Sequence, residues 1–198
     1  SSSCASARTP RPEALKKLIV TADDFGAAAQ VNDAVLAAHS HGILTAASLM
    51  VSAPHAGDAV TRARQTPSLR VGLHLVLVEG RPTLPPGRVP DLVDAAGFFR
   101  TDMARAGAAM FFLPHVRRQL AAEIAAQFQA FALTGLTLDH VNAHKHFHLH
   151  PTIAGLIVEN AALYGVRGAR VPLEPQAVLA RIEPRHASAV VALTTPFA

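Results

Sequence analysis

Short apolar segments alternate with amphipathic segments along most of the chain. Runs of apolar, often β-branched residues predict buried strands at residues 18–22, 43–51, 69–78, 136–143 and 166–171. Apolar positions at helical spacing predict helices at residues 27–41, 55–65, 114–133, 151–164 and, with a break near Pro184, 175–197. This alternation predicts an α/β fold in which a parallel sheet is covered by helices, and it leaves an open sheet or a barrel as alternatives.

Two segments break the alternation. Residues 1–16 are rich in Ser, Arg and Pro and contain no apolar stretch of the kind found in a secretory signal, so we expect a flexible leader before a single domain at residues 17–198. Residues 79–110 contain clustered prolines and glycines and predict a long irregular excursion. Loops of this length in compact domains are usually lids or binding segments.

The composition narrows the class of protein. Half of the 198 residues are hydrophobic and 16% are charged, which is typical of a chain that folds around a core. The net charge of +4 comes from scattered arginines without a run of like charges, so we expect no nucleic-acid partner, while peripheral contact with an anionic membrane stays open. Cys4 is the only cysteine, which excludes an intramolecular disulfide. We expect a cytoplasmic protein, with membrane association as the alternative.

Histidines are concentrated between Asp139 and His150, where five of the 11 histidines lie. Imidazole is the commonest protein ligand for transition metals and the usual proton carrier near neutral pH, so the cluster indicates metal binding or acid–base chemistry. Pro151 is typical of the first turn of a helix, so we expect His144–His150 to form a loop at the carboxyl end of the preceding strand. For any single histidine in it, a solvated loop position is an equally good interpretation.

Three predicted strands end at or near a potential metal ligand. Asp23 and Asp24 follow the first strand, His74 lies within the third, and His144 follows the fourth. Because the carboxyl ends of parallel strands lie at one edge of a sheet, we expect these side chains to meet. Two imidazoles and one carboxylate leave an open position on a divalent cation, which is the arrangement that activates a water molecule. The other carboxylate can then serve as a general base.

These residues also have other interpretations. The aspartate pair followed by Gly26 is compatible with the N-cap of the next helix, and His74 is compatible with a hydrogen-bonded core histidine. Two histidines and one carboxylate also describe non-haem iron oxygenases, although the close His-x-Asp pair that is common in those sites is absent here. The residue types alone leave these alternatives open.

Three motifs in order resemble the YdjC-like carbohydrate deacetylases. They are Thr-Ala-Asp-Asp-Phe-Gly at residues 21–26, Val-Gly-Leu-His-Leu at 71–75 and His-Val-Asn-Ala-His-Lys-His-Phe-His at 140–148. The resemblance runs from about Leu18 to Pro172. Phe-Arg-Thr-Asp-Met at 99–103, together with the third motif, is similar to the hopanoid-biosynthesis-associated branch of the family.

The resemblance implies a (β/α) barrel-like hydrolase that removes acetate from an N-acetylated amino sugar, including one carried on a hopanoid glycolipid. It also implies one divalent cation, Mg²⁺ or Zn²⁺, held by Asp24, His74 and His144, with Asp23 as the catalytic base. Water deprotonated toward Asp23 would attack the acetamide carbonyl.

The chain departs from the family pattern near its C-terminus. The strands that would close the barrel, and the His-Pro motif that would protonate the leaving amine, are not found before Ala198, so we expect a domain truncated at that end. His146 or His148 can supply the proton or play a structural role. Arg170 is better interpreted as a surface arginine than as a sugar ligand.

Two further expectations follow from a truncated domain. A fragment that binds metal or a sugar lipid without turnover is the alternative to an enzyme. Exposed strand edges would favour a homodimer.

Overall fold

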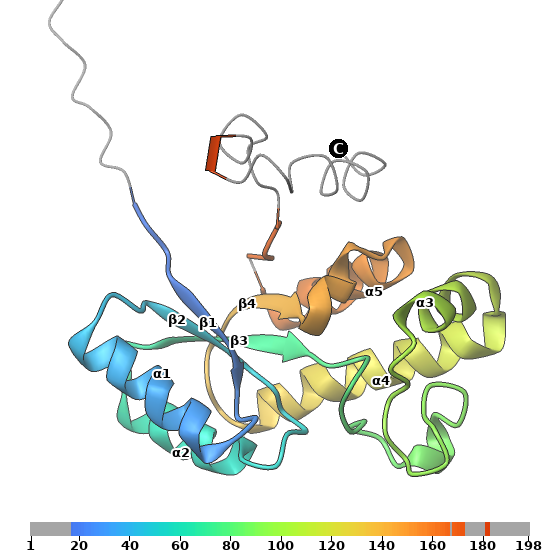
Figure 1. Ribbon diagram of the computed structural model, residues 1–198, viewed down its shortest axis with the longest axis horizontal. Coiled ribbons are helices and arrows are strands. Elements are labelled where there is room, and N and C mark those ends of the chain that lie inside the picture. The colour runs from blue at the N-terminus through green and yellow to red at the C-terminus, as the bar shows by residue number, and fades with distance from the viewer. Residues whose placement is uncertain (1–16, 167, 173–180, 183–198) are drawn as a thin grey trace, which may run out of the picture.

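The computed structural model describes residues 17–166, 168–172 and 181–182 (Figure 1). Its elements are β1 Thr21–Phe25, α1 Ala29–His41, β2 Ala46–Leu49, α2 Ala56–Gln65, β3 Arg70–Leu75, the 3₁₀ helix η1 Pro86–Arg88, α3 Met103–Phe112, α4 Pro114–Leu133, β4 Leu138–Ala143, the 3₁₀ segment η2 His144–Leu149 and α5 Pro151–Tyr164. The strands form one parallel sheet in the order β1-β2-β3-β4. The predicted α/β class with a parallel sheet is confirmed.

The fifth predicted strand is present only as an isolated bridge. Val141 of β4 pairs with Ala169 in parallel orientation, so the chain returns to the free edge of β4 without forming a ladder in the described residues. The leader at residues 1–16 and nearly all of the helix predicted at 175–197 lie outside the described residues. Among the helices that are described, none combines the length and the apolar character that a bilayer span requires.

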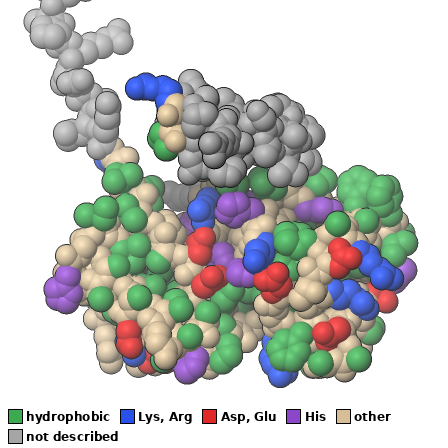
Figure 2. All heavy atoms as spheres, viewed as in Figure 1, with side chains coloured by type: hydrophobic (Ala, Val, Ile, Leu, Met, Phe, Trp, Pro, Cys, Tyr) green, Lys and Arg blue, Asp and Glu red, His purple; other side chains and the backbone are tan. Residues whose placement is uncertain are grey.

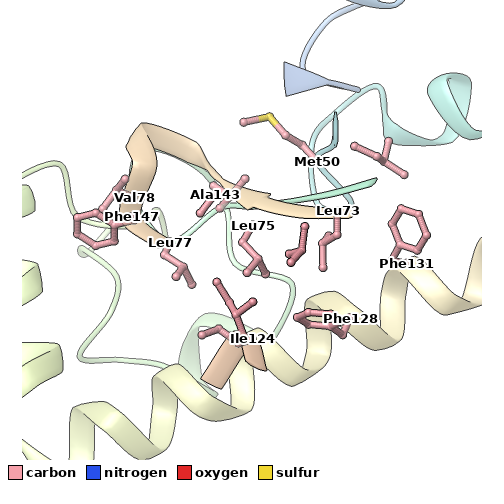
Figure 3. Close-up of a cluster of buried hydrophobic side chains, with 14 of the residues drawn as sticks. Met50, Leu73, Leu75, Leu77, Val78, Ile124, Phe128, Phe131, Ala143 and Phe147 are labelled. Atoms are coloured by element: carbon pink, nitrogen blue, oxygen red, sulfur yellow. The ribbon is translucent and has the colours of Figure 1, made fainter. Parts of the chain in front are cut away.

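One face of the sheet forms the apolar core with α4. Leu73 and Leu75 of β3 are fully buried and face this helix, as Figure 3 shows. The predicted apolar stripe of α4 is confirmed, because every member is buried: Val116, Leu120, Ile124, Phe128 and Phe131. In Figure 1, α1, α2 and α4 lie on the same side of the sheet. Burial of this stripe fixes the sheet on its helices and so fixes the carboxyl ends of the strands.

The opposite face of the same strands is polar. His140 of β4 reaches across β3 above Gly72 and meets Ser48 of β2, with 2.9 Å between Nε2 and Oγ. A Cβ atom on Gly72 would lie 2.5 Å from the His140 ring, so only glycine leaves room for this crossing. His74 and Asn142 lie on the same face and hydrogen-bond to each other. The apolar and polar faces therefore alternate residue by residue along β3, as the pleat requires.

The bounds predicted for the first strand were wrong. The sequence predicts a strand at residues 18–22 with a turn from Asp23, whereas β1 includes both aspartates and ends at Phe25. Leu18 and Ile19 are about three-quarters exposed, so their apolar character did not mark a buried strand. The pairing with β2 is instead interrupted between Ala22 and Phe25, which lets two consecutive polar residues stand in the strand.

The excursion over residues 79–110 was also wrong in part, because it contains the beginning of α3. The side chain of Asp102 caps this helix by accepting a hydrogen bond from the Arg105 amide at 3.0 Å. Ala106 and Met110, one turn apart, are buried. The cap and this packing outweigh the low helix propensity of Gly107, whose carbonyl accepts a hydrogen bond from His150.

Candidate metal centre

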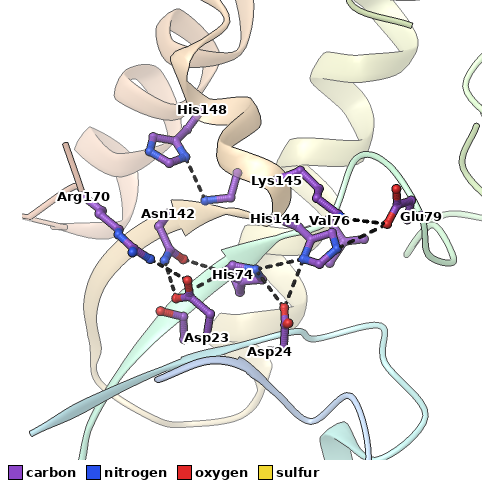
Figure 4. A network of polar contacts seen from close by, with 12 residues as sticks. Asp23, Asp24, His74, Val76, Glu79, Asn142, His144, Lys145, His148 and Arg170 are labelled. Carbon is purple, nitrogen blue, oxygen red and sulfur yellow. Dashed lines mark hydrogen bonds and ion pairs between the residues drawn. The ribbon is translucent and has the colours of Figure 1, made fainter. Parts of the chain in front are cut away.

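The conformation of Asp24 brings the two adjacent carboxylates to different partners at one edge of the sheet. Consecutive side chains on a regular strand point to opposite faces. Asp24, however, has a φ of 59°, inside the interruption of the pairing between β1 and β2. Asp23 then contacts Asn142 and Arg170, whereas Asp24 contacts His74 and His144 (Figure 4). The helix-cap interpretation is wrong, because α1 begins after Ala28 and has no side-chain cap.

Asp24, His74 and His144 converge on one point. Oδ1 of Asp24 lies 3.1 Å from Nε2 of His74 and 3.0 Å from Nδ1 of His144, and these two nitrogens are 3.4 Å apart. Ligand atoms around a tetrahedral zinc ion, with bonds of about 2.0–2.1 Å, stand roughly 3.3 Å from one another. The separations therefore fit a single cation, and the chemistry of one carboxylate and two imidazoles suits Zn²⁺ and related divalent ions.

The hydrogen bonds of His74 leave its metal-facing nitrogen free to bind an ion. Its Nδ1 donates to Oδ1 of Asn142 at 2.7 Å, so Nδ1 carries a proton, and Nε2, which points toward Asp24 and His144, is the nitrogen left for an ion. His74 and Asn142 are almost completely buried, at 2% and 1% exposure. A buried amide that fixes the tautomer in this way is typical of the outer partners of metal-binding histidines. The interpretation of His74 as a hydrogen-bonded core histidine is correct for Nδ1, which bonds to Asn142. It does not account for Nε2, which faces Asp24 and His144.

His144 has a more distant polar neighbour in Glu79. Nδ1 of His144 faces Asp24, while its Nε2 lies 4.0 Å from Oε2 of Glu79. The same carboxylate oxygen is 3.3 Å from Nζ of Lys145. Each histidine of the cluster therefore directs one nitrogen toward Asp24 and the other toward a polar group of a neighbouring segment.

Asp23 is held in its ionised form. Burial alone would raise its pKa, but the hydrogen bond from Asn142, at 2.8 Å, and the positive groups of His74 and Arg170 outweigh burial and lower the pKa. Arg170 donates to Oδ2, while Asn142 donates to Oδ1. Because each carboxylate oxygen can accept two hydrogen bonds, Asp23 keeps acceptor capacity for a further proton donor. Arg170 is therefore an exposed arginine, as predicted, and its guanidinium group is the ion-pair partner of Asp23.

Asp24 is ionised for a different reason. Hydrogen bonding to His74 lowers its pKa, and the charges of His74 and His144 act in the same direction, while burial opposes them. An ionised carboxylate is the form that binds a cation.

Backbone strain is concentrated at this cluster. Among the described residues, four that are not glycine have a positive φ, and all four belong to the site or follow it directly: Asp24, Glu79, Lys145 and His146. Such conformations cost about 1–3 kcal/mol each and persist where the surrounding structure fixes them, which is typical of functional sites. They explain why the predicted loop after His144 is instead a kinked pair of 3₁₀ turns.

A pocket of about 320 Å³ opens beside the cluster, with Asp24 and His144 in its wall. The segment after β3 supplies Glu79, Arg81 and Phe98, so part of the predicted excursion does line a binding-sized pocket. The guanidinium group of Arg81 lies over the Phe98 ring, 4.2 Å from its centroid. The wall thus combines an aromatic surface, polar groups and the ligand cluster.

The other histidines of the motif do not join the cluster in the described residues. His146 is exposed, whereas His148 is buried and accepts a hydrogen bond on Nδ1 from the Ala143 amide at 3.1 Å. His150 donates to the Gly107 carbonyl at 3.0 Å and joins α3 to the start of α5. His140 contacts Ser48 and Asp139. Within the described residues, His148 and His150 contact backbone groups away from the cluster, and the alternation of histidines does not make one ligand set.

Asn142 and Glu79 are the functional candidates that the sequence prediction missed. Asn142 had a readable signal, because it alternates with His140 and His144 in a strand and therefore shares their face. Glu79 had a weaker one, as the acidic residue directly after an apolar strand. Neither position indicates by itself which histidine it would contact.

The fold and the ligand set define an α/β domain with a candidate metal centre at the carboxyl ends of its parallel strands. The family model described as YdjC-like protein matches residues 17–195, and the chain belongs to this family. The predicted family is confirmed, whereas its hopanoid-associated branch stays a prediction.

Curated relatives in bacteria and in an animal support the assignment. A carbohydrate deacetylase of Brevibacillus brevis is 39% identical over 150 residues, which are 76% of this chain and 57% of that protein. A carbohydrate deacetylase of Geobacillus stearothermophilus is 37% identical over 79% of this chain and 58% of its own length, and one of Mus musculus is 35% identical over 80% and 51%. The chain thus spans little more than half the length of these relatives.

A solved structure has the same architecture. A crystal structure from Enterococcus faecalis, named provisionally as a cellobiose-phosphate cleavage protein, aligns with a TM-score of 0.69 and 29% identity, over 88% of this chain and 64% of that one.

Proposed function

We propose that this chain carries the metal-binding half of a carbohydrate N-deacetylase, which hydrolyses the acetamide of an N-acetylated amino sugar. The observation that carries the proposal is the convergence of three ligand atoms, 3.0 to 3.4 Å apart, beside an ionised Asp23 and a pocket of about 320 Å³. The carbohydrate deacetylases among its relatives support the same reaction class.

The ligand residues would hold a cation that acts on both the attacking water and the acetamide carbonyl. A divalent cation bound by Asp24, His74 and His144 supplies Lewis acidity, which lowers the pKa of water and stabilises negative charge on a carbonyl oxygen. Asn142 keeps the Nδ1 proton on His74, so the other nitrogen stays available as a ligand. Mg²⁺ and Zn²⁺ are both compatible with the donor types, and two nitrogen ligands favour Zn²⁺.

Asp23 would accept the proton of the attacking water. Its lowered pKa keeps it ionised at neutral pH, and Asn142 and Arg170 hold its two oxygens in place. A carboxylate with a low pKa is a weak base, so it can serve only if the water is acidified at the same time. Asp23 can therefore act as the base only when a cation is bound by Asp24, His74 and His144.

The pocket suits a sugar ring. A pyranose has apolar C–H faces and a rim of hydroxyl groups, and the pocket wall offers Phe98 and Met50 together with Ser52 and Arg81. Its volume lies at the small end of the range for small-molecule sites, which matches one ring with its acetamide group.

Acetate release tests the proposal. The substrates are free N-acetylglucosamine, short chitin oligomers and a lipid-linked acetylglucosamine, the last of which tests the hopanoid-associated branch. The assay runs without oxygen, because acetate release under those conditions separates hydrolysis from an iron oxygenase. Asp23→Asn should lower turnover by about 10²–10⁴-fold while one ion per chain is retained. Asp24→Asn should lose both.

Asp33→Asn is the matched control, because it makes the same change on an exposed carboxylate of α1 and should leave both readouts unchanged. Normal turnover by Asp23→Asn would refute its role as the base. Ion binding without acetate release from any of the substrates would support a binding fragment instead.

A further inference from the structure

The corner between α3 and α4 exposes three consecutive large apolar residues. Phe111, Phe112 and Leu113 are 46%, 72% and 42% exposed, although each belongs to a type that is normally buried. The two phenylalanine rings pack edge to face, with their centroids 4.8 Å apart, so they protrude together. We refer to these three residues as the apolar corner. Figure 2 shows hydrophobic side chains gathered at the end of the molecule where Figure 1 places α3.

Exposed arginines lie on both helices that form the apolar corner. Arg117 and Arg118 lie on the first turns of α4 and line a groove of about 470 Å³ that begins at Pro114, the residue after the corner. Arg105 is exposed on α3. None of these arginines pairs with a carboxylate of the described residues, and the groove contains one acidic residue, Glu159.

The corner lies on the same end of the molecule as the candidate metal centre. The ring of Phe111 is 5.9 Å from that of His150, which in turn is 6.5 Å from Phe147. Phe147 belongs to η2, the segment that starts at His144. A surface bound at the corner would therefore lie close to the segment that carries a candidate ligand.

We propose that the apolar corner is an anchor that enters the headgroup region of an anionic lipid surface, while Arg117 and Arg118 contact the headgroups. Exposed aromatic and leucine side chains beside unpaired arginines are the combination that binds such interfaces. A second copy of the chain fits less well, because a two-fold contact at the corner would bring like-charged arginines toward one another. This inference does not depend on deacetylase activity.

A single tryptophan reporter tests the anchor directly. The chain has no tryptophan, so Phe112→Trp gives one fluorescent side chain at the corner. Leu133→Trp is the matched control, because Leu133 is 79% exposed at the C-terminal end of α4, a helix about 30 Å long that begins at the apolar corner. With vesicles of phosphatidylcholine and phosphatidylglycerol, we expect a blue shift for Phe112→Trp and none for Leu133→Trp. Vesicles of phosphatidylcholine alone should produce a much smaller shift.

Vesicle flotation separates the two components of binding. Phe112→Ser should weaken partitioning about tenfold or more, because one phenylalanine no longer leaves water. Arg117→Gln with Arg118→Gln should weaken it about fivefold for each charge removed, and added salt should reduce binding by the unmodified protein. The matched pair Arg117→Lys with Arg118→Lys keeps both charges and should keep the binding.

Several results would overturn the proposal. The first is an emission of Phe112→Trp that does not change with anionic vesicles, or that changes equally for Leu133→Trp. The second is a blue-shifted emission before any vesicle is added, which would show that the chain itself covers the corner. The third is a dimer in vesicle-free solution, measured by light scattering, that Phe112→Ser converts to a monomer.

Discussion

The two faces of β3 carry the same backbone but depend on different physical interactions. Leu73 and Leu75 point toward α4 and contribute through the apolar area that they bury. Gly72 and His74 point to the other side, where Gly72 makes room for a crossing histidine and His74 meets a specific amide. The first face tolerates changes that preserve volume, whereas the second depends on individual hydrogen-bonding partners. Substitutions on the two faces should therefore separate stability from ion binding.

The largest effect on stability should come from the apolar face. Phe128→Ala removes a fully buried ring that stacks on Tyr164, so the free energy of unfolding should fall by about 3–5 kcal/mol. Denaturant titration measures this loss, and the exposed residue Leu133→Ala on the same helix should change it by less than about 0.5 kcal/mol. If the folded fraction of Phe128→Ala lost its affinity for divalent ions, the two faces would not be independent.

The next effect concerns the crossing point on the polar face. Gly72→Ala places a Cβ atom 2.5 Å from the His140 ring, so we expect a loss of about 1–3 kcal/mol and a displaced His140–Ser48 contact. Gly57→Ala in α2 is the control, since nothing lies within 4 Å of its added Cβ, and alanine should stabilise that helix slightly. Equal stability of Gly72→Ala and the unmodified protein would show that His140 does not occupy this position.

Substitution of Asn142 on the polar face should change the affinity for a divalent ion more than the free energy of unfolding. Asn142→Leu keeps the approximate volume but removes the acceptor of His74 and a donor to Asp23, so affinity for Zn²⁺ should fall about 10–100-fold. Nitrogen-15 NMR of the histidine rings supplies an independent readout, because the tautomer of His74 that is protonated on Nδ1 should no longer be the major one. An unchanged affinity with an unchanged tautomer would exclude a positioning role for Asn142.

The smallest effect is the pH dependence of stability. Burial lowers the pKa of His148 and His150 below the ordinary value of 6.5. Below the ordinary pKa, these two histidines bind protons more readily in the unfolded chain than in the folded chain. Their contribution to the free energy of unfolding is therefore complete above about pH 6.5 and decreases as the pH falls below it.

An asparagine at position 148 tests this assignment. His148→Asn retains an acceptor for the Ala143 amide, and it should reduce the acid-side slope by up to about 1.4 kcal/mol per pH unit. Thermal unfolding between pH 7 and 5 measures the slope, and the exposed His41→Asn serves as the control. A slope that His148→Asn leaves unchanged would assign the acid sensitivity to other groups.

The apolar face was predictable because its signal is periodic. The stripe of α4 and the runs around Leu73 and Val141 follow the spacing of a helix and of buried strands, which depends only on residue type. The position of α3 was missed because its start depends on a single cap, Asp102, within a segment rich in proline and glycine. Caps and positive-φ positions are local features without periodicity, so pattern analysis detects them poorly.

The polar face was predictable only in part. The aspartate pair, His74 and His144 were identified together because each lies at or near a strand end, and the parallel order of the strands then brings them to one edge. The choice of Asp24 over Asp23 as the ligand came from the family resemblance. The orientation of the His74 ring was not predictable, because it depends on a hydrogen bond to Asn142, which is 68 residues away in the sequence. The ion pair of Arg170 was not predictable for the same reason, because its partner Asp23 is 147 residues away in the sequence.

Calorimetric titration with Zn²⁺ tests the central claim most directly. The unmodified protein should bind one ion per chain, and Asp24→Asn, His74→Gln and His144→Gln should each weaken binding by about 100-fold or more, while Asp23→Asn stays within a few-fold. Binding that survives the loss of Asp24, or that is lost only with Asp23, would contradict a shared site of Asp24, His74 and His144.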